Sequence, residues 1–322
     1  MRPAAPNTWR RRLPRWFLGL LAIAALLAPI LANDVPLFAR IGGTWSFPAF
    51  TTWFGPPPTA PTDFGWKDWW AKLPEGGDDF ALMPPWAYGP TETNLDKVLA
   101  GPSLAHPFGN DDTGRDVLAR LLHGASTALG IGAAAVVLGA FLGVAFGALA
   151  GLRRGLADFC VLRAIEVSMC FPTLLLLITA AAFFGPSVPG MVGLMAATYW
   201  TSFARIVRGE LLSLREREFV LAARGLGVQG WRLLRGHLLP QLRGQVAITA
   251  AFCIANAIIV ESTLSFLDVG PTSSSWGAVL EQGKSNAHLG AWHLWFFPAC
   301  LIVATVSCCH ALADQVRARR LG

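Results

Sequence analysis

The sequence has few charged residues and lacks the motifs of several enzyme classes. Only 14% of its 322 residues are charged, whereas 53% are hydrophobic. A typical soluble domain has about a quarter charged residues, so this composition excludes an ordinary soluble protein. The chain contains no GxxxxGK phosphate loop followed by Ser or Thr, no HExxH zinc motif and no GxSxG nucleophile elbow. We therefore predict a membrane protein with no catalytic residue, no metal ligand and no cofactor of its own.

Cysteine is also scarce, and its positions argue against disulfides and metal sites. All six cysteines fall inside predicted apolar segments, and their spacing matches no metal motif. Two of them are adjacent and would point to different faces of a helix. We predict small, buried apolar residues rather than a redox or metal site. The six are Cys160, Cys170, Cys253, Cys300, Cys308 and Cys309.

The hydrophobic residues gather in six separate segments. Each is close to the ~20 residues that a helix needs to cross the hydrocarbon core of a bilayer. We therefore predict an all-α integral membrane protein with six transmembrane helices and a large irregular insertion after the first of them. The segments lie near 16–32, 127–152, 159–184, 187–207, 244–267 and 291–313.

The distribution of charge predicts which side of the membrane each connection occupies. Residues 1–15 contain five arginines and no acid, and residues 205–243 contain eight arginines against three glutamates. In contrast, residues 33–100 contain eight acidic and four basic residues. Positively charged connections stay in the cytoplasm, so both termini are predicted to be cytoplasmic and the acidic segment external. A basic patch beside membrane spans is normally a topology signal, which argues against nucleic acid as a partner.

These patterns divide the chain into successive regions. The first apolar run could be a signal peptide, but its length and poor cleavage site favour a retained helix. Residues 33–105 contain many prolines and six tryptophans, which predicts short elements in either a packed plug or a contact surface. The predicted regions are a tail (1–15), a first transmembrane helix (16–32), an extracytoplasmic segment (33–117), a core with five transmembrane helices (118–313) that contains a cytoplasmic coupling segment (211–240), and a cytoplasmic tail (314–322).

An acidic cluster precedes the second span. The spacing of Asp111, Asp112 and Asp116 does not fit a calcium-binding EF-hand loop, which requires alternating ligands and a glutamate at its twelfth position. We predict instead that an Asp or Thr caps a helix and that Arg115 pairs with a nearby acid.

Other features of the predicted spans concern packing and polar sites. Between Gly139 and Gly151, every fourth residue is a glycine, which predicts close contact with another helix. Pro172 predicts a kink in the third span. The fifth span contains Asn256 and Glu261. Polar residues within a span are candidates for a transport pathway, although a structural hydrogen bond is an equal alternative for Glu261.

One polar stretch, residues 215–240, is too charged to cross a bilayer yet lies between apolar segments, so we predict that it docks a partner. Its spacing resembles the EAA motif of permease subunits of binding-protein-dependent ABC importers, in which Glu-Ala-Ala is followed after three residues by Gly and after nine more by Ile-x-Leu-Pro. It departs from the motif at Leu221, which replaces Glu and has Glu218 nearby, and at His237, which replaces Ile. The matching residues are Ala222, Ala223, Gly227, Leu239 and Pro240.

Two further stretches resemble the dipeptide, oligopeptide and nickel branch of this family. Residues 106–121 are similar to the segment before the second span of that branch, and residues 255–267 with Trp276-Gly277 are similar to its fifth span and the following loop. Within the branch, the segments 33–105 and 282–286 look most like the C-type permease of microcin C and oligopeptide uptake systems.

The resemblance implies a function, a fold and partners. It implies the type I ABC importer permease fold in a bacterial inner membrane, and half of a pathway for oligopeptides or peptide-like compounds. A homologous second permease, cytoplasmic ATPase subunits, an extracytoplasmic substrate-binding protein and membrane lipid would be its partners. ATPase coupling would involve Glu218, Ala222, Ala223, Arg224, Gly227, Leu239 and Pro240. An ion-coupled secondary transporter is the alternative from another class, and it would require buried acids near the middle of the membrane.

Overall fold

The computed structural model describes residues 8–52, 55, 59–62, 65–73, 79–153, 155–228 and 230–321. The chain is mainly helical and divides into two compact units. Unit 1 contains residues 1–18, 130–264 and 303–322, and unit 2 contains residues 19–129 and 265–302. Four helices begin in one unit and end in the other: α1 (Thr8–Leu26), α5 (Val117–Leu152), α11 (Leu239–Phe266) and α13 (His293–Leu321).

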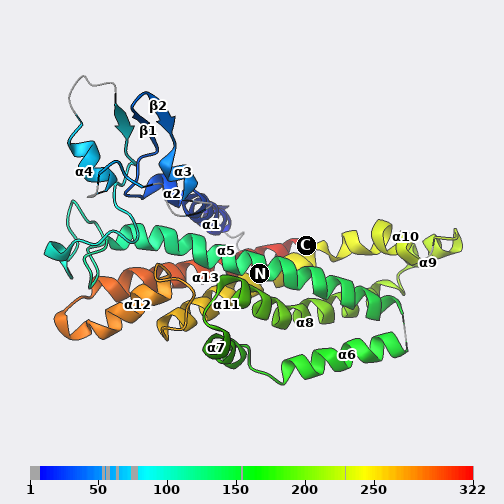
Figure 1. Ribbon diagram of the computed structural model, residues 1–322. Coiled ribbons are helices and arrows are strands. Elements are labelled where there is room, and N and C mark those ends of the chain that lie inside the picture. Colours follow the sequence, from blue (N-terminus) through cyan, green and yellow to red (C-terminus); the bar gives the residue numbers. More distant parts are fainter. Residues whose placement is uncertain are drawn as a thin grey trace. The chain divides into compact units, whose positions relative to one another are not determined.

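Unit 2 contains the small sheet and most of the short elements (Figure 1). Its strands form one antiparallel sheet in the order β2-β1-β3, in which Ala39 pairs with Ser46 on one side and with Ala81 on the other. Ala39 and Ala81 pack with Val35, Ala49 and Trp66 in a small core. The elements are α2 (Ala28–Leu31), β1 (Phe38–Ile41), β2 (Thr44–Ser46), α3 (Pro48–Thr51), α4 (Trp66–Ala71), β3 (Phe80–Leu82), η1 (Leu95–Lys97), α12 (Trp276–Ser285) and η3 (Ala287–Leu289).

Within the described part of residues 33–105, the strands and helices are all short, as the many prolines predict. The first predicted span also differs from a single helix, because α1 ends at Leu26 and α2 begins at Ala28 with Pro29 in its first turn. A proline is accepted in the first turn of a helix but interrupts a helix that is already running, which explains the break.

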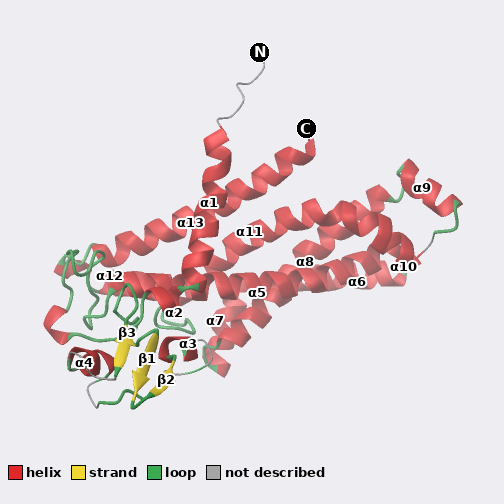
Figure 2. Ribbon diagram, turned by 90° about the horizontal axis from the view of Figure 1, so that it is seen from above, coloured by secondary structure: helices red, strands yellow, loops and turns green. Residues whose placement is uncertain are grey.

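In unit 1, helix α5 runs alongside α6 (Leu156–Met169), α8 (Val188–Leu214) and α11 (Figure 2). The glycine ridge of α5 packs on α8, as the sequence predicts: a Cβ added at Gly143 would lie 2.5 Å from the carbonyl oxygen of Trp200, and one added at Gly147 would lie 2.6 Å from that of Ala204. Small residues are thus needed for this close backbone approach. The elements are α6 (Leu156–Met169), α7 (Thr173–Phe184), α8 (Val188–Leu214), α9 (Glu218–Gly225), α10 (Gly230–Leu233) and the π-helical turn η2 (Leu234–Leu238), together with parts of α1, α5, α11 and α13.

The predicted kink at Pro172 is a complete break. Helix α6 ends at Met169, α7 begins at Thr173, and their axes differ by 72°. Proline disfavours helical geometry at the residue before it and cannot donate a backbone hydrogen bond, so the helix ends before Pro172.

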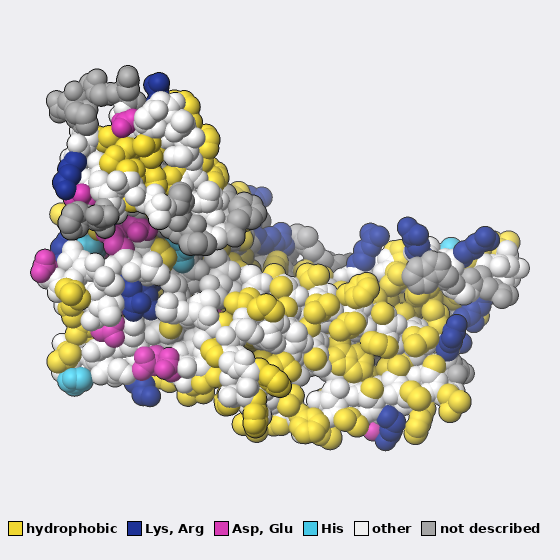
Figure 3. All heavy atoms as spheres, in the orientation of Figure 1, with side chains coloured by type: hydrophobic (Ala, Val, Ile, Leu, Met, Phe, Trp, Pro, Cys, Tyr) yellow, Lys and Arg dark blue, Asp and Glu magenta, His cyan; other side chains and the backbone are white. Residues whose placement is uncertain are grey.

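Three helical segments of the described chain are long and apolar enough to cross a membrane, or four if the bent pair α6–α7 counts as one span. They are Val117–Leu152, Leu234–Phe266 and His293–Ala318, and neither α1 nor α8 is among them. Figure 3 shows hydrophobic side chains covering the visible side of the unit 1 helices, whereas Lys and Arg gather at the end that carries α9 and α10. The count of six spans stays a prediction.

The cysteine prediction is only partly correct. Cys253 and Cys309 are buried and Cys308 is half-buried, but Cys160, Cys170 and Cys300 are exposed on the isolated chain. A helix that packs on one side only leaves its other side exposed, so position inside an apolar segment does not ensure burial. No group of His, Cys, Asp and Glu in the described residues could hold a metal ion.

Candidate coupling segment and pathway cavity

The predicted docking stretch contains a short separate helix, α9, which both ribbon views place at one end of the unit 1 helices (Figures 1 and 2). Arg217 has extended backbone geometry, and its carbonyl oxygen accepts hydrogen bonds from the N–H groups of Val220 and Leu221. Glu218 lies in the first turn and Arg224 in the last. This order of charges favours the helix, because the N-terminal end of a helix dipole is positive and the C-terminal end negative.

Gly227 ends α9. Its φ of +82° lies in the left-handed region, where any residue with a Cβ is strained. The N–H of Gly227 donates to the carbonyl oxygen of Arg224 at 2.9 Å, and the N–H of Val228 donates to that of Ala223 at 3.0 Å. These two bonds form a Schellman motif, which satisfies carbonyl groups at the end of the helix. Glycine is therefore required at 227 for the geometry of the turn.

Helix α9 has one buried and one exposed face. Val220 is fully buried and Ala223 is 7% exposed, and both pack in a cluster with Leu211, Leu234 and other apolar residues of unit 1.

The opposite face presents Glu218, Ala222 and Leu221, the last of which is 53% exposed. The two alanines of the motif thus have different environments: Ala222 is open to a partner, whereas Ala223 anchors α9 to the rest of its own unit.

The chain continues from α9 into α11 through the π-helical turn η2. The N–H of Leu239 bonds to the carbonyl oxygen of Leu234, five residues earlier, and α11 begins at Leu239. Pro240 follows directly. Because proline lacks an N–H and clashes with the carbonyl group four residues before it, a wider turn at this point accommodates the ring. Leu239 is half-buried and Pro240 exposed.

A cavity of about 800 Å³ lies within unit 1 beside the break between α6 and α7. Asn256 lines it, and its side-chain oxygen accepts a hydrogen bond of 3.0 Å from the hydroxyl of Tyr199. Among the described residues that line the cavity there is no Asp or Glu, and the polar groups are mostly neutral. They are Ser168, Thr173, Thr198, Tyr199, Thr201, Ser202, Gln245, Thr249 and Asn256, together with His310 and Arg317.

Glu261 does not line this cavity. Its side chain is fully buried, and Ser262 Oγ lies 3.4 Å from its Oε2 atom. The structure therefore separates the two polar residues of the fifth predicted span: Asn256 faces a cavity, whereas Glu261 lies in the packed interior.

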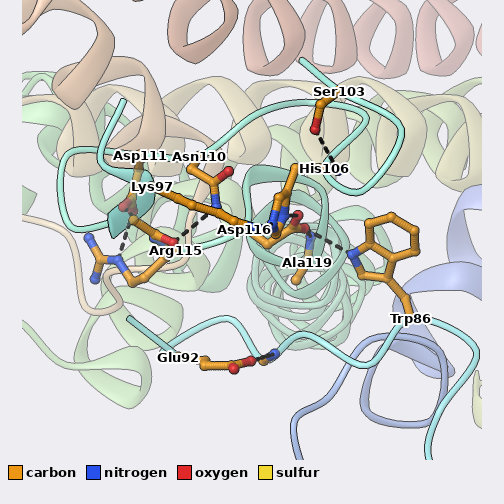
Figure 4. A network of polar contacts seen from close by, with 12 residues as sticks. Trp86, Glu92, Lys97, Ser103, His106, Asn110, Asp111, Arg115, Asp116 and Ala119 are labelled. Carbon is orange, nitrogen blue, oxygen red and sulfur yellow. Dashed lines mark hydrogen bonds and ion pairs between the residues drawn. The ribbon is translucent and has the colours of Figure 1, made fainter. Parts of the chain in front are cut away.

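The second stretch of the resemblance, residues 106–121, forms a buried polar network in unit 2 (Figure 4). Asp116 caps α5, because its Oδ1 atom accepts a hydrogen bond of 2.8 Å from the N–H of Ala119. The same carboxylate accepts bonds from Trp86 Nε1 at 3.0 Å and from His106 Nδ1 at 2.8 Å. The predicted capping role is confirmed.

Asp111 is the most highly connected acid of the network. Arg115 Nε donates to it at 2.7 Å and Arg120 Nη1 at 2.5 Å, and the backbone N–H groups of Thr113 and Arg115 donate as well. Burial alone would raise the pKa of Asp111, but the two guanidinium groups and the backbone donors outweigh burial and lower it. Arg120 also donates to Gln282 and to the carbonyl oxygen of Ser273, so the network joins α5 to the segment around α12.

The sequence profile of the family described as "Binding-protein-dependent transport system inner membrane component" matches residues 143–320, which is more than half of the chain. The chain belongs to this family. A putative peptide transport system permease protein of Brucella suis is 35% identical to this permease over 241 residues, covering 74% of this chain and 81% of the relative. The dipeptide transport system permease protein DppC of Bacillus subtilis is 35% identical over 229 residues, covering 70% of each chain.

The permease also shares its fold with a solved transporter. An inward-facing structure of the MetNI methionine ABC transporter matches 62% of this permease and 96% of the other chain, with a TM-score of 0.53 and 18% sequence identity. The type I ABC importer permease fold that the resemblance implies is therefore confirmed as the fold class. The match covers nearly all of the MetNI chain. Over a third of this permease lies outside the shared fold.

Sequence reasoning missed most of the residues that line the cavity of the permease. A signal was present: Gln245, Thr249 and Asn256 are spaced by four and seven residues on α11, which places all three on one face of the helix. The ion pair between Asp158 and Arg208, with 2.8 Å between Oδ2 and Nη2, was also missed because it joins different helices. A second ion pair joins Arg163 and Glu166, three residues apart on α6, with 2.6 Å between Nη1 and Oε2.

Proposed function

We propose that this chain is the non-catalytic transmembrane subunit of an ATP-driven importer for oligopeptides or peptide-like compounds. It supplies half of the translocation pathway, and a homologous second permease supplies the other half. An extracytoplasmic binding protein delivers the substrate, and cytoplasmic ATPase subunits dock on α9. Both termini lie in the cytoplasm of a bacterial cell, six helices cross the inner membrane, and residues 33–117 are extracytoplasmic.

The main support for this function is that α9 has one buried face and one exposed face. Val220 and Ala223 attach the helix to the apolar cluster of unit 1, so a force on its exposed face is transmitted to α8 and α11. The Schellman turn at Gly227 fixes where the helix ends. Rigid docking of an ATPase on the exposed face would then carry ATP-driven motion into the membrane helices, as domain closures do in other switching proteins.

The relatives and the cavity support peptides as the substrate class. Two similar proteins are named as peptide and dipeptide permeases. The cavity beside Tyr199 and Asn256 offers hydroxyl and amide groups, which suit the N–H and C=O groups of a peptide backbone irrespective of its side chains. The ion-coupled alternative lacks support. The family is that of binding-protein-dependent transporters, and the described lining of the cavity contains no carboxylate.

A pair of glycine substitutions tests the coupling role of α9. An added Cβ meets no atom within 4 Å at either Gly225 or Gly227, but only Gly227 has a positive φ. Gly227→Ala therefore strains the turn by about 1–2 kcal/mol, whereas Gly225→Ala adds the same methyl group without that strain. We expect Gly227→Ala to lower ATP-dependent uptake of a labelled peptide into proteoliposomes at least fivefold at an unchanged permease level. Equal uptake by both variants would contradict the proposed role of this turn.

The proposed orientation of the chain in the membrane can be tested separately. An epitope inserted between Gly42 and Gly43, in the turn between β1 and β2, should be accessible to antibody in intact spheroplasts. An epitope added after Gly322 should become accessible only after permeabilisation. The opposite pattern would overturn the proposed topology without affecting the family assignment.

A further inference from the structure

A second cavity in unit 1 has no role in the proposed transport cycle. It is a groove of about 1150 Å³ between α5 and the segment α9–α11. Its walls are apolar: exposed side chains of Phe141, Ala145 and Leu149 follow one side of α5, and Leu233, Leu234 and Leu239 lie opposite.

The charges of the groove are all of one sign. Three arginines line it, Arg153 just beyond the end of α5, Arg215 just beyond α8 and Arg224 on α9, and none of the described lining residues is acidic. Arg215 donates from Nη1 to the carbonyl oxygen of Gly151 at 2.9 Å, which fixes its position at the end of α5. The groove therefore combines an apolar wall with a cationic end.

The dimensions of the groove match those of a lipid chain. Its α5 wall extends from Ala140 to Leu152, which corresponds to about 18 Å along a helix at ~1.5 Å per residue. One leaflet of a bilayer contributes about half of the ~30 Å hydrocarbon thickness. An acyl chain lying along α5 would thus reach the arginines with its headgroup.

We propose that this groove binds one anionic phospholipid, with an acyl chain along Phe141, Ala145 and Leu149 and the phosphate group held by Arg153, Arg215 and Arg224. Guanidinium groups bind phosphate through paired, charge-assisted hydrogen bonds, and basic pockets at the ends of membrane helices favour anionic headgroups. Because Arg224 belongs to α9, the bound lipid would hold the coupling helix against α5. The bound lipid would be distinct from the transported substrate.

Lipid retention by the full-length chain tests the proposal. The chain is purified in detergent, exchanged into nanodiscs with equal amounts of dioleoyl phosphatidylglycerol and dioleoyl phosphatidylcholine, and released for native mass spectrometry. We expect phosphatidylglycerol to be retained over phosphatidylcholine by the wild type. The double variant Arg153→Gln/Arg224→Gln should lose that preference by about tenfold or more, since each arginine favours an anionic lipid severalfold.

Two further variants separate the groove from general surface charge. Ala145→Trp fills the apolar wall and should lower retention of both lipids while the thermal midpoint stays within about 2 °C of the wild type, as expected for an exposed position. Arg163→Gln removes an exposed arginine of α6 and should leave retention unchanged.

Several outcomes would overturn the lipid assignment. Equal retention of the two lipids by the wild type would do so, as would unchanged phosphatidylglycerol retention in the arginine double variant. Cross-linking of Ala145→Cys to a second polypeptide chain, with lipid retention unaffected, would show that the groove is a protein interface.

Discussion

The network of residues 106–121 and the helix α9 are both stretches that the sequence marks as polar, but the structure uses them in opposite ways. In the network, Asp111 and Arg120 are almost fully buried and paired at 2.5 Å. On α9, Glu218 and Ala222 are exposed, and the contacts that hold the helix are apolar. The first stretch stabilises its own unit, and the second leaves a surface available to a partner.

This difference in burial predicts that substitutions in the two stretches will have different consequences. A buried charge is retained only where partners compensate for the lost hydration, so its removal damages the fold. An exposed small residue contributes little to stability, so its removal damages only binding. Substitutions in the two stretches should accordingly affect different measurements.

The largest effect is expected at Asp111. Asp111→Ala leaves Arg120 buried without its carboxylate partner, which should destabilise the protein by about 3–5 kcal/mol. The thermal midpoint and the amount of folded permease in membranes would report it. Asp68→Ala is the control, because the pair Asp68–Lys72 is partly exposed and should contribute about 0–1 kcal/mol. Similar losses from the two variants would remove the distinction between buried and exposed pairs.

A smaller effect should distinguish the two faces of α9. Ala223→Leu forces a larger side chain into the cluster with Val220 and Leu234, at a cost of about 1–3 kcal/mol. Ala222→Leu makes the same change on the exposed side and should alter stability by less than about 0.5 kcal/mol. Chemical denaturation of the purified chain in detergent measures both values. If Ala222→Leu is the more destabilising variant, the assignment of the faces is wrong.

The smallest effect is expected at Glu261. Glu261→Gln conserves the shape and most hydrogen-bonding capacity of a side chain that does not line the cavity. Peptide uptake, divided by the amount of folded permease, should remain within about twofold of the wild type. A loss of uptake at an unchanged protein level would instead place Glu261 in the pathway.

Features that depend on residues close together in the sequence could be predicted. The need for glycine at 227, the helix break at Pro172 and the glycine ridge of α5 all follow from backbone geometry within a few residues. The cap of α5 by Asp116 and the pair Arg163–Glu166 are equally local.

Tertiary packing could not be predicted in this way. Ala222 and Ala223 are identical neighbours, and only the packing of α9 on unit 1 determines which of them is buried. The contacts of Arg120 with Ser273 and Gln282 join residues more than 150 positions apart, so no local spacing reveals them. The cavity beside Asn256 depends in the same way on where α6, α7, α8 and α11 lie relative to one another.

The docking of an ATPase on α9 is tested most directly by co-purification. The permease is isolated through a C-terminal affinity tag from its native membranes, and ATP hydrolysis is measured in the eluate. Ala222→Arg places a long charged side chain on the exposed face of α9, and Ser213→Arg adds the same charge to an exposed position of α8. We predict that Ala222→Arg lowers the co-purified ATP hydrolysis about tenfold or more at an unchanged permease level, as expected when a charge enters the core of an interface, while Ser213→Arg does not. Full ATP hydrolysis with Ala222→Arg would contradict the account.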